Sequence, residues 1–501
     1  MIMRVVAPLL FIVACASLAA GQGLGSANSQ SLIGSALRAR NYGQALQLIR
    51  SQLRESPKDT KLWTLEGIAL SGLGNNREAL VAYNHALNIS PDYLAALEGA
   101  AELEYKEGSA RAIPLLKRIL KLQPDNSTSH AMLAVLAYKQ HDCPTAVQHF
   151  RASADLISSQ PVALAQYGSC LMNLQRPDEA ISEFQEILRL MPNDPHAHYN
   201  LAVAQLTANH GKDAIATLAP LIEGQNPDPD ALDLASSAYE DSEDTPRAVS
   251  LLRQAIVSNP KNAKYYLDFA ALSFKHSSFQ VGIDMIDVGI KELPGVAALY
   301  VARGVLFIQL ERFEKGEADF ATANRLDPGQ TSGAVAQGLA QIQQSNLDQA
   351  LATIRSKLKT HPEDAFLHYL QAQVITQNGA EVGTPQFKEA IAAASRAAQL
   401  KPEFVLARDL LGNLYLKSGQ LDKSIEQSRL ALHDSPSDQE ALYHLIQALR
   451  KSGRDSKGEL PVLVKRLADL RQESRKTEAS ENKYKLYEPA SSAASDTGPT
   501  N

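Results

Sequence analysis

A period of 34 residues constrains this chain more than any other feature of its sequence. Prolines recur at or close to this interval; two gaps are twice as long, and the gap before Pro402 carries six extra residues. Because the residue before a proline is disfavoured in a helix, we interpret each of these prolines as the end of a helical unit. The prolines are Pro57, Pro91, Pro124, Pro192, Pro260, Pro294, Pro328, Pro362, Pro402 and Pro436.

The stretch from Thr60 to Tyr93 shows what one unit contains. With Thr60 as position 1, positions 4, 8 and 11 share one face of a first helix, and positions 20, 24 and 27 share one face of a second. The only tryptophan of the chain, Trp63, is at position 4, and we expect it to lie between the two helices. These positions hold Trp63, Gly67 and Leu70, then Ala79, Tyr83 and Ala86.

Small residues recur at positions 8 and 20, where they let the two helices approach closely. Position 8 holds Gly67, Ala101, Ala134, Gly168, Ala202, Ser236, Ala270, Gly304, Gly338, Ala372 and Gly412. Position 20 holds Ala45, Ala79, Ala112, Ala146, Ala180, Ala214, Ala248, Gly282, Gly316, Ala350, Ala390 and Ser424. Two columns without a large residue are not expected by chance in a chain that is 45% hydrophobic.

This pattern resembles the tetratricopeptide repeat (TPR), a 34-residue helix–turn–helix unit. The resemblance covers residues 26–453, as about twelve repeats and a partial one. It implies an all-α fold, a right-handed α-solenoid of about twelve TPR helix–turn–helix repeats, in which each repeat packs mainly on its neighbours.

Residues 1–21 have the pattern of a secretory signal peptide. Arg4 gives a positive start, Val5 to Val13 an apolar run, and small residues follow. The run is too short for a confident membrane span and is interrupted by Pro8. The alternative is a lipoprotein signal, since Ile12 to Cys15 resembles a bacterial lipobox that would place a lipid anchor at Cys15. Both interpretations predict an exported protein, periplasmic or secreted.

The C-terminal residues are predicted to close the solenoid. Within residues 454–472, the segment from Glu459 to Gln472 is amphipathic and should form a helix that caps the last repeat. Residues 473–501 are rich in Ser, Ala, Lys and Glu and are predicted to be disordered. The apolar side of the capping helix is predicted to consist of Leu460, Val464, Leu467 and Leu470.

No sequence motif indicates catalysis. The chain has no HExxH, Walker or GxSxG motif, and the segments outside the repeats are too short for a catalytic domain. The net charge of −6 argues against a nucleic-acid-binding protein, which usually carries a basic surface. We therefore predict a protein that is not an enzyme and that needs no cofactor or metal.

Two of the three cysteines are predicted to lie near each other. Cys143 begins the second helix of repeat 4, and Cys170 ends the first helix of repeat 5. Neighbouring repeats bring these helix ends together, and an exported protein meets an oxidising compartment. Sequence does not fix the Cα distance that a disulfide needs, so two buried free thiols are the favoured interpretation and a disulfide is the alternative.

The resemblance also implies where a partner binds. In TPR proteins, positions 2, 5, 9 and 12 of each first helix line a concave groove, and we call them the groove positions. Heat-shock chaperone adaptors of the family clamp a C-terminal carboxylate with Lys at position 5 and Asn at position 9. No Lys stands at position 5 in this chain, so this clamp is absent.

The groove positions of repeats 8 to 11 are mostly apolar and form the candidate partner surface. Repeat 7 adds acidic residues that could meet a basic residue of the partner. The alternative is that positions 9 and 12 pack against the neighbouring repeat, since packing is the usual role of apolar periodicity in helices. The candidate residues are Asp233, Glu240, Leu267, Phe274, Val301, Val305, Ile308, Val335, Leu339, Ile342, Phe366 and Tyr369.

Together these features predict a non-catalytic scaffold or adaptor outside the cytoplasm. It would bind a protein or peptide segment in its groove, because contiguous apolar surfaces of this size usually mark interaction sites. The alternative function is an accessory subunit that positions an envelope enzyme or a secretion or glycan-assembly machine.

Overall fold

The computed structural model describes residues 24–453 and 458–482, and the regular elements within these ranges are all α-helices. The predicted signal segment, with Cys15, and residues 483–501 of the predicted tail lie outside the described residues. The chain divides into two compact units, residues 1–248 and 249–501, with the boundary inside helix α15. Each unit is described by itself.

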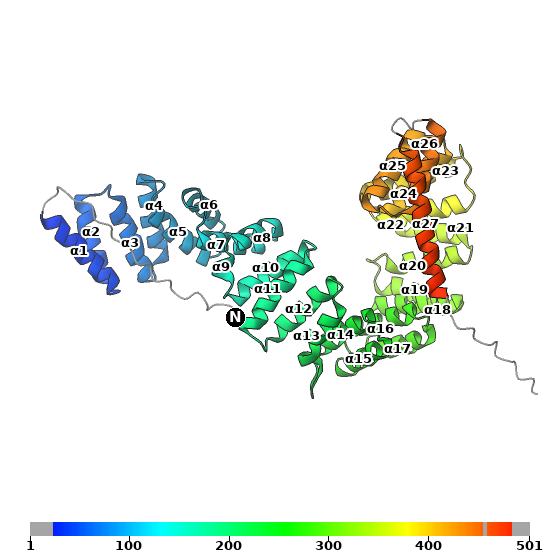
Figure 1. Cartoon of the computed structure of the whole chain (residues 1–501), viewed down its shortest axis with the longest axis horizontal. Helices are drawn as coiled ribbons and strands as arrows, with labels where there is room; N and C mark the ends of the chain where they lie inside the picture. Colours follow the sequence, from blue (N-terminus) through cyan, green and yellow to red (C-terminus); the bar gives the residue numbers. More distant parts are fainter. Residues whose placement is uncertain (1–23, 454–457, 483–501) are drawn as a thin grey trace, which may run out of the picture. The chain divides into compact units, whose positions relative to one another are not determined.

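The first unit is a row of helices that follow one another in chain order (Figure 1). Its helices are α1 (Leu24–Arg38), α2 (Tyr42–Glu55), α3 (Thr60–Gly72), α4 (Asn76–Ile89), α5 (Leu94–Lys106), α6 (Ala112–Leu122), α7 (Ser127–Lys139), α8 (Cys143–Ala152), α9 (Ala154–Ile157), α10 (Pro161–Asn173), α11 (Pro177–Leu190), α12 (Pro195–Thr207), α13 (Gly211–Ile222) and α14 (Pro229–Asp241), followed by α15 (Thr245–Ser258) at the boundary.

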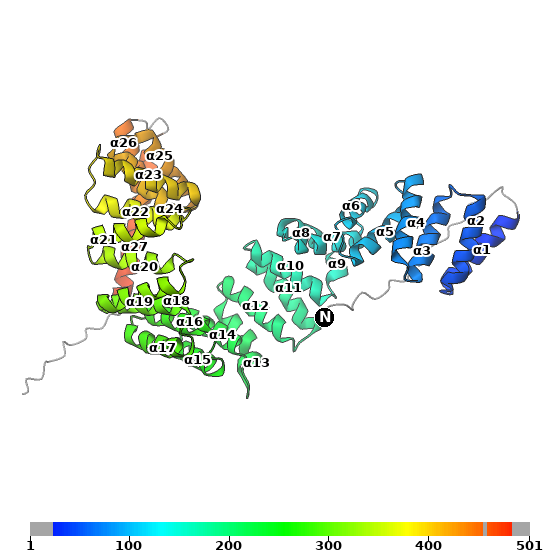
Figure 2. The same ribbon diagram turned by 180° about the vertical axis from the view of Figure 1, so that it is seen from behind.

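The second unit repeats this arrangement, as Figure 2 shows from behind. Its helices are α16 (Ala263–Lys275), α17 (Phe279–Glu292), α18 (Ala297–Gln309), α19 (Phe313–Leu326), α20 (Ser332–Gln343), α21 (Leu347–Leu358), α22 (Ala365–Gln377), α23 (Pro385–Leu400), α24 (Val405–Lys417), α25 (Leu421–Asp434), α26 (Gln439–Ser452) and α27 (Leu460–Asn482). Apart from the short α9, which follows α8 within repeat 4, the helices pair in order as the first and second helix of each repeat, so the predicted α-solenoid is confirmed.

Small residues at position 8 leave room for an aromatic ring from position 24 of the same repeat. A Cβ atom added to Gly67 would lie 2.5 Å from the Tyr83 ring, and one added to Gly304 would lie 2.5 Å from Phe320. Position 20 is equally tight, since Ala79 and Ala180 are fully buried. The two small columns therefore set how closely the paired helices pack, as the sequence predicts.

A left-handed residue at position 15 ends the first helix of each repeat. Glycine holds it in some repeats, as at Gly74 with φ of 82°. Elsewhere an L-residue adopts the same conformation, which usually costs about 1–2 kcal/mol. The glycines are Gly74, Gly108, Gly379, Gly419 and Gly453, and the others are Arg40, His141, Gln175, Asn209, Glu243, Ser277, Glu311 and Ser345.

In many repeats the side chain at position 4 is hydrogen-bonded to the carbonyl of the proline that ends the preceding repeat. Trp63 Nε1 donates a hydrogen bond to the carbonyl of Pro57 over 2.9 Å, and its ring stacks on His85 of α4, with 4.5 Å between centroids. Trp63 therefore lies against the second helix as predicted, but it is half-buried rather than enclosed. The same bond joins His130 to Pro124, His198 to Pro192, Tyr266 to Pro260, Tyr300 to Pro294, His368 to Pro362 and Arg408 to Pro402.

A disulfide joins repeats 4 and 5. Cys143 at the start of α8 is bonded to Cys170 near the end of α10, and their Cα atoms are 5.0 Å apart. The favoured interpretation of two free thiols is therefore wrong. The cause is geometric, because the second helix of repeat 4 and the first helix of repeat 5 approach within the range that a disulfide spans.

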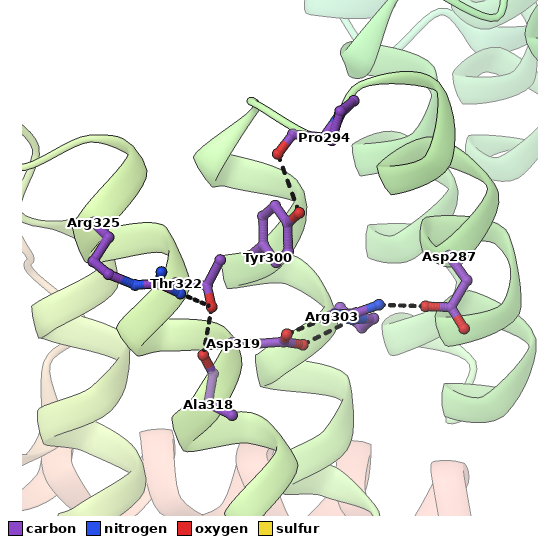
Figure 3. A network of polar contacts seen from close by, with 8 residues as sticks. All are labelled: Asp287, Pro294, Tyr300, Arg303, Ala318, Asp319, Thr322 and Arg325. Carbon is purple, nitrogen blue, oxygen red and sulfur yellow. Dashed lines mark hydrogen bonds and ion pairs between the residues drawn. The ribbon is translucent and has the colours of Figure 1, made fainter.

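An ion pair network joins repeats 8 and 9 (Figure 3). Arg303 on α18 contacts Asp287 of α17 over 2.6 Å and binds Asp319 of α19 with two hydrogen bonds of 2.7 and 2.8 Å. The Asp319 side chain is 8% exposed and that of Arg303 21%. Hydrogen bonds to Asp319 and then to Asp287 raise the pKa of Arg303 above its ordinary value, although burial opposes them.

Helix α27 covers the end of the last repeat, but its details differ from the prediction. Leu467 is buried against Leu442 and Ile446 of α26. Val464 is 37% exposed and does not belong to the apolar side; Leu463 packs there instead, beside Leu460 and Leu470. The helix continues to Asn482, beyond its predicted end at Gln472 and into the predicted tail.

Candidate functional site

The groove positions of the second unit lie on first helices that contact one another in sequence, from α16 through α18, α20, α22 and α24 to α26. Two of the predicted residues are exposed: Phe274 at 44% and Leu339 at 42%. Phe274 packs edge-on against Phe279, with 5.8 Å between centroids. The half-buried residues are Leu267, Val301, Val305, Val335, Ile342, Phe366 and Tyr369.

Ile308 does not belong to the accessible part of this surface. Its side chain is 4% exposed and packs with Phe320 and Ala340. The reason is Gly316 at position 20 of the same repeat, because a Cβ there would lie 2.7 Å from Ile308 Cδ1. Ile308 fills the space that Gly316, which has no side chain, leaves empty. The prediction that Ile308 is accessible to a partner is therefore wrong.

The acidic residues of repeat 7 belong to the first unit and do not form the predicted charged rim. Asp233 on α14 is 5% exposed, so its carboxylate is not available to a partner. Glu240 is half-buried, and its carboxylate accepts a hydrogen bond of 2.8 Å from Thr245. Among the other position-5 side chains of this unit, Thr64 is also buried, at 2% exposed, whereas Glu98 and Tyr199 are half-buried.

Sequence reasoning missed a cluster in repeats 11 to 13. The rings of Phe366, Tyr369 and Phe404 lie within 5.2–5.8 Å of one another. Asp409 of α24 accepts a hydrogen bond of 2.7 Å from His444 of α26. Burial, and then the charge of Asp409, raise the pKa of Tyr369. The signal was present in the sequence, because Asp409 follows Tyr369 in the position-5 column.

Other kinds of site have little support among the described residues. A cavity of about 480 Å³ lies in the first unit against α11, α12 and α13, with Asp178, His210 and Asp213 in its lining. Within residues 24–453 and 458–482, no group of three or more His, Cys, Asp or Glu side chains could hold a metal ion. In the same ranges no helix is both long and apolar enough to cross a membrane.

Comparison with known proteins gives a consistent picture. Residues 40–164 match the TPR domain of cytochrome c-type biogenesis protein H, and residues 171–237 match a tetratricopeptide repeat model. The chain is 24% identical over 245 residues to the Hsp70-Hsp90 organizing protein of Triticum aestivum, covering 46% of this chain and 40% of that protein. It is 20% identical over 257 residues to anaphase-promoting complex subunit 7 of Homo sapiens, covering 51% of this chain and 45% of that protein.

The chain thus spans less than half the length of these two curated relatives. Among solved structures, yeast Tom70 is 15% identical with a TM-score of 0.43, covering 92% of this chain and 96% of that one. TPR proteins are generally scaffolds for protein interactions and are typically non-catalytic. The repeat register and the helix pairs are those of a tetratricopeptide repeat protein, and the family models match residues 40–164 and 171–237.

Proposed function

We propose that this protein is an exported, non-catalytic scaffold that binds a segment of a partner protein along the groove positions of repeats 8 to 11. The observation that carries the proposal is the exposure of Leu339 and Phe274 beside half-buried apolar neighbours on consecutive first helices. A contiguous apolar surface in water is costly, and such surfaces usually mark interaction sites. A partner segment with apolar side chains would remove this surface from water.

The test is binding of peptides from a random display library. Peptides are first selected on the wild-type protein, and their affinities are then measured for Leu339→Glu and for Val281→Glu. Val281 is a matched control because it is 45% exposed but lies on α17, the second helix of repeat 8. We expect Leu339→Glu to lose binding and Val281→Glu to keep it. The free energy of unfolding of both variants should be within about 0.5 kcal/mol of the wild-type value, since both sites are exposed.

Ile308→Glu supplies the opposite control. It places an unpaired charge in the core beside Phe320, so it should unfold the neighbourhood before any binding is tested. A Leu339→Glu variant that melts normally and keeps every selected peptide would eliminate this surface. A Leu339→Glu variant that melts as early as Ile308→Glu would instead assign Leu339 to packing.

Export is proposed on two supports. The first residues have the charge and apolar pattern of a signal peptide, and the Cys143–Cys170 disulfide suits an oxidising compartment. Cell fractionation followed by thiol counting under denaturing, non-reducing conditions tests both. We expect the protein outside the cytoplasm with this pair unreactive. Membrane retention that is lost in Cys15→Ala would identify the lipid anchor. Cytoplasmic protein with both thiols reactive contradicts export.

A second candidate function is an accessory subunit that positions an envelope enzyme or an assembly machine. It is favoured by the match of residues 40–164 to the TPR domain of a cytochrome c-type biogenesis protein. Crosslinking in intact envelopes distinguishes the two candidates. The accessory role predicts recovery of one enzyme complex in fixed proportion, whereas a general scaffold recovers segments that share only a sequence pattern.

A further inference from the structure

The groove positions of the second unit change character after repeat 10. At positions 5, 9 and 12, repeats 8 to 10 hold aliphatic and phenyl side chains, whereas position 5 of repeats 11 to 13 holds Tyr369, Asp409 and Tyr443. We call this second group the aromatic–acid cluster. It consists of Phe366 and Tyr369 on α22, Phe404 and Asp409 at and within the start of α24, and Tyr443 and His444 on α26.

Asp409 is held in place but remains partly accessible. Its Oδ1 accepts a hydrogen bond of 2.7 Å from Nδ1 of His444, a side chain that is 7% exposed, while the Asp409 side chain is 19% exposed. Among the hydrogen bonds of residues 24–453 and 458–482, Asp409 takes part only in this one. The neighbouring guanidinium of Arg408 is directed to Pro402 and Gln427 instead. One carboxylate oxygen is therefore oriented by His444, and within residues 24–453 and 458–482 the other oxygen forms no ion pair.

The aromatic rings around Asp409 are suited to a cation. Two of them already have cationic side chains over their faces: Lys401 Nζ lies 5.9 Å from the centroid of Phe404, and the Arg471 guanidinium lies 5.9 Å from that of Tyr443. Tyr443 is nevertheless 40% exposed. A carboxylate attracts a cation through its charge, and the faces of nearby aromatic rings add the attraction of their quadrupoles.

We infer that the aromatic–acid cluster receives the side chain of a lysine or arginine from the same partner segment whose apolar side chains cover Leu339. This inference rests on the proposed function and moves the basic residue of the partner from repeat 7 to repeat 12. The charge of Asp409 selects a basic residue and disfavours an acidic or phosphorylated one. The partner segment is therefore apolar at one end and basic at the other.

The geometry sets the spacing of these residues. Packed helices lie about 8–10 Å apart, and an extended chain advances about 3.3 Å per residue, so one repeat corresponds to about three residues of partner. Leu339 is in repeat 10 and Asp409 in repeat 12. The basic residue should therefore lie about six residues from the apolar residue that contacts Leu339.

The experiment uses the full-length protein and a random display library of 15-residue peptides. Wild type should enrich peptides with Lys or Arg about six residues from an apolar position. For a synthetic peptide from this set, Asp409→Asn should weaken binding about 10- to 100-fold, the range for a charge-assisted hydrogen bond. Glu426→Gln is the matched control, because it removes the same charge from an exposed site on α25 and should change nothing.

A double-mutant cycle makes the result specific. Replacing the basic residue of the peptide by Gln should weaken binding to wild type and cause no further loss with Asp409→Asn. The Asn side chain can still accept the His444 hydrogen bond, and Asp409→Glu, which restores the charge, should restore part of the affinity. Melting curves of all variants check that the fold is intact; if Asp409→Asn is unfolded, the wild-type comparison of Lys and Gln peptides decides.

The outcomes separate this inference from the proposed function. Apolar peptides that bind without Lys or Arg, and are lost in Leu339→Glu, overturn only the role of Asp409. Equal affinity of Lys and Gln peptides for wild type does the same. If wild type selects no peptide at all, the proposed function fails and this inference fails with it.

Discussion

Repeats 4 and 5 and repeats 8 and 9 are joined between equivalent helices, but at different repeat positions and by different chemistry. In both cases the second helix of one repeat is linked to the first helix of the next. In the first unit the link is the Cys143–Cys170 disulfide, and in the second unit it is Arg303 between Asp287 and Asp319. The helices and turns around both links follow the same 34-residue register. The backbone architecture therefore does not depend on the chemistry of the junction, which can be covalent or ionic.

A third junction shows that even the charges can be exchanged. Arg50 of α2 and Glu66 of α3 stand at the same repeat positions as Asp287 and Arg303, with opposite sign, and lie 2.8 Å apart. The two ionic junctions differ in the burial of their arginine: the Arg50 side chain is 50% exposed and that of Arg303 is 21% exposed. Burial should therefore decide how much each junction contributes to stability.

The largest expected effect is loss of the ionic junction. Arg303→Met leaves the Asp319 carboxylate buried without its cation, which typically costs about 3–5 kcal/mol. Arg355→Met is the control, because the Arg355–Glu389 pair is exposed and should be worth under about 1 kcal/mol. Denaturant unfolding measures both. Equal losses for the two variants would show that burial of Arg303 does not matter.

The covalent junction should rank second. Removing the disulfide with Cys143→Ser and Cys170→Ser frees a loop of 27 residues and should cost about 2–4 kcal/mol. Because repeats couple mainly to their neighbours, hydrogen exchange should accelerate in repeats 4 and 5 first. The same treatment should leave α17 to α19 unchanged, and acceleration there would contradict the comparison.

Sequence predicted the fold well because the repeat imposes the same contacts many times. Gly67 and Tyr83, or Gly304 and Phe320, are complementary within one repeat, so their spacing alone predicts that the helices pack closely. Local pairs of this kind need no knowledge of the rest of the chain. The apolar side of α27 was less predictable. Leu463 rather than Val464 packs on α26, and only the contact with α26 decides between them.

The candidate surface was predicted in outline but not residue by residue. Leu339 and Ile308 are both apolar groove positions, yet one is 42% exposed and the other 4%. The difference comes from Gly316, whose missing side chain opens a space that Ile308 fills. Periodicity places a residue on a face, whereas burial depends on the volume of its neighbours. Asp409 stands in the position-5 column, but no periodic signal predicts its hydrogen bond to His444 of the next repeat.

A smaller, pH-dependent effect should distinguish the two junctions further. In repeat 4, burial lowers the pKa of His149, and the charges of His130 and Lys117 lower it further. The folded state therefore binds this proton less readily than the unfolded state. The contribution of His149 to stability is present above the ordinary histidine pKa of about 6.5 and is lost as the pH falls below that value.

Melting curves between pH 7.5 and pH 5 test this expectation. Protection factors, which correct hydrogen exchange for its intrinsic slowing at lower pH, should fall in repeat 4 as the pH falls, and His149→Gln should remove that part of the change. Arg303 keeps its charge throughout this range, as any arginine does because its pKa lies far above it, so its guanidinium adds no proton-linked change in repeats 8 and 9. Unchanged protection factors in wild-type repeat 4 at pH 5 would contradict the effect of His149.

The smallest expected effect lies in the turns, and it should be the same beside both junctions. Gln175 in repeat 5 and Glu311 in repeat 9 adopt φ of 57° and 58° at position 15. Glycine removes the strain of this conformation but adds freedom to the unfolded chain, so Gln175→Gly and Glu311→Gly should each stabilise by about 0.5–1 kcal/mol. Gly74→Ala is the reverse control. Its φ is 82° and an added Cβ meets nothing within 4 Å, so its cost of about 1 kcal/mol is the backbone strain less the entropy that the unfolded chain loses, with no steric clash. Equal gains at Gln175 and Glu311 would place the difference between the two regions in their junctions, whereas unequal gains would show that the junction chemistry also alters the turns.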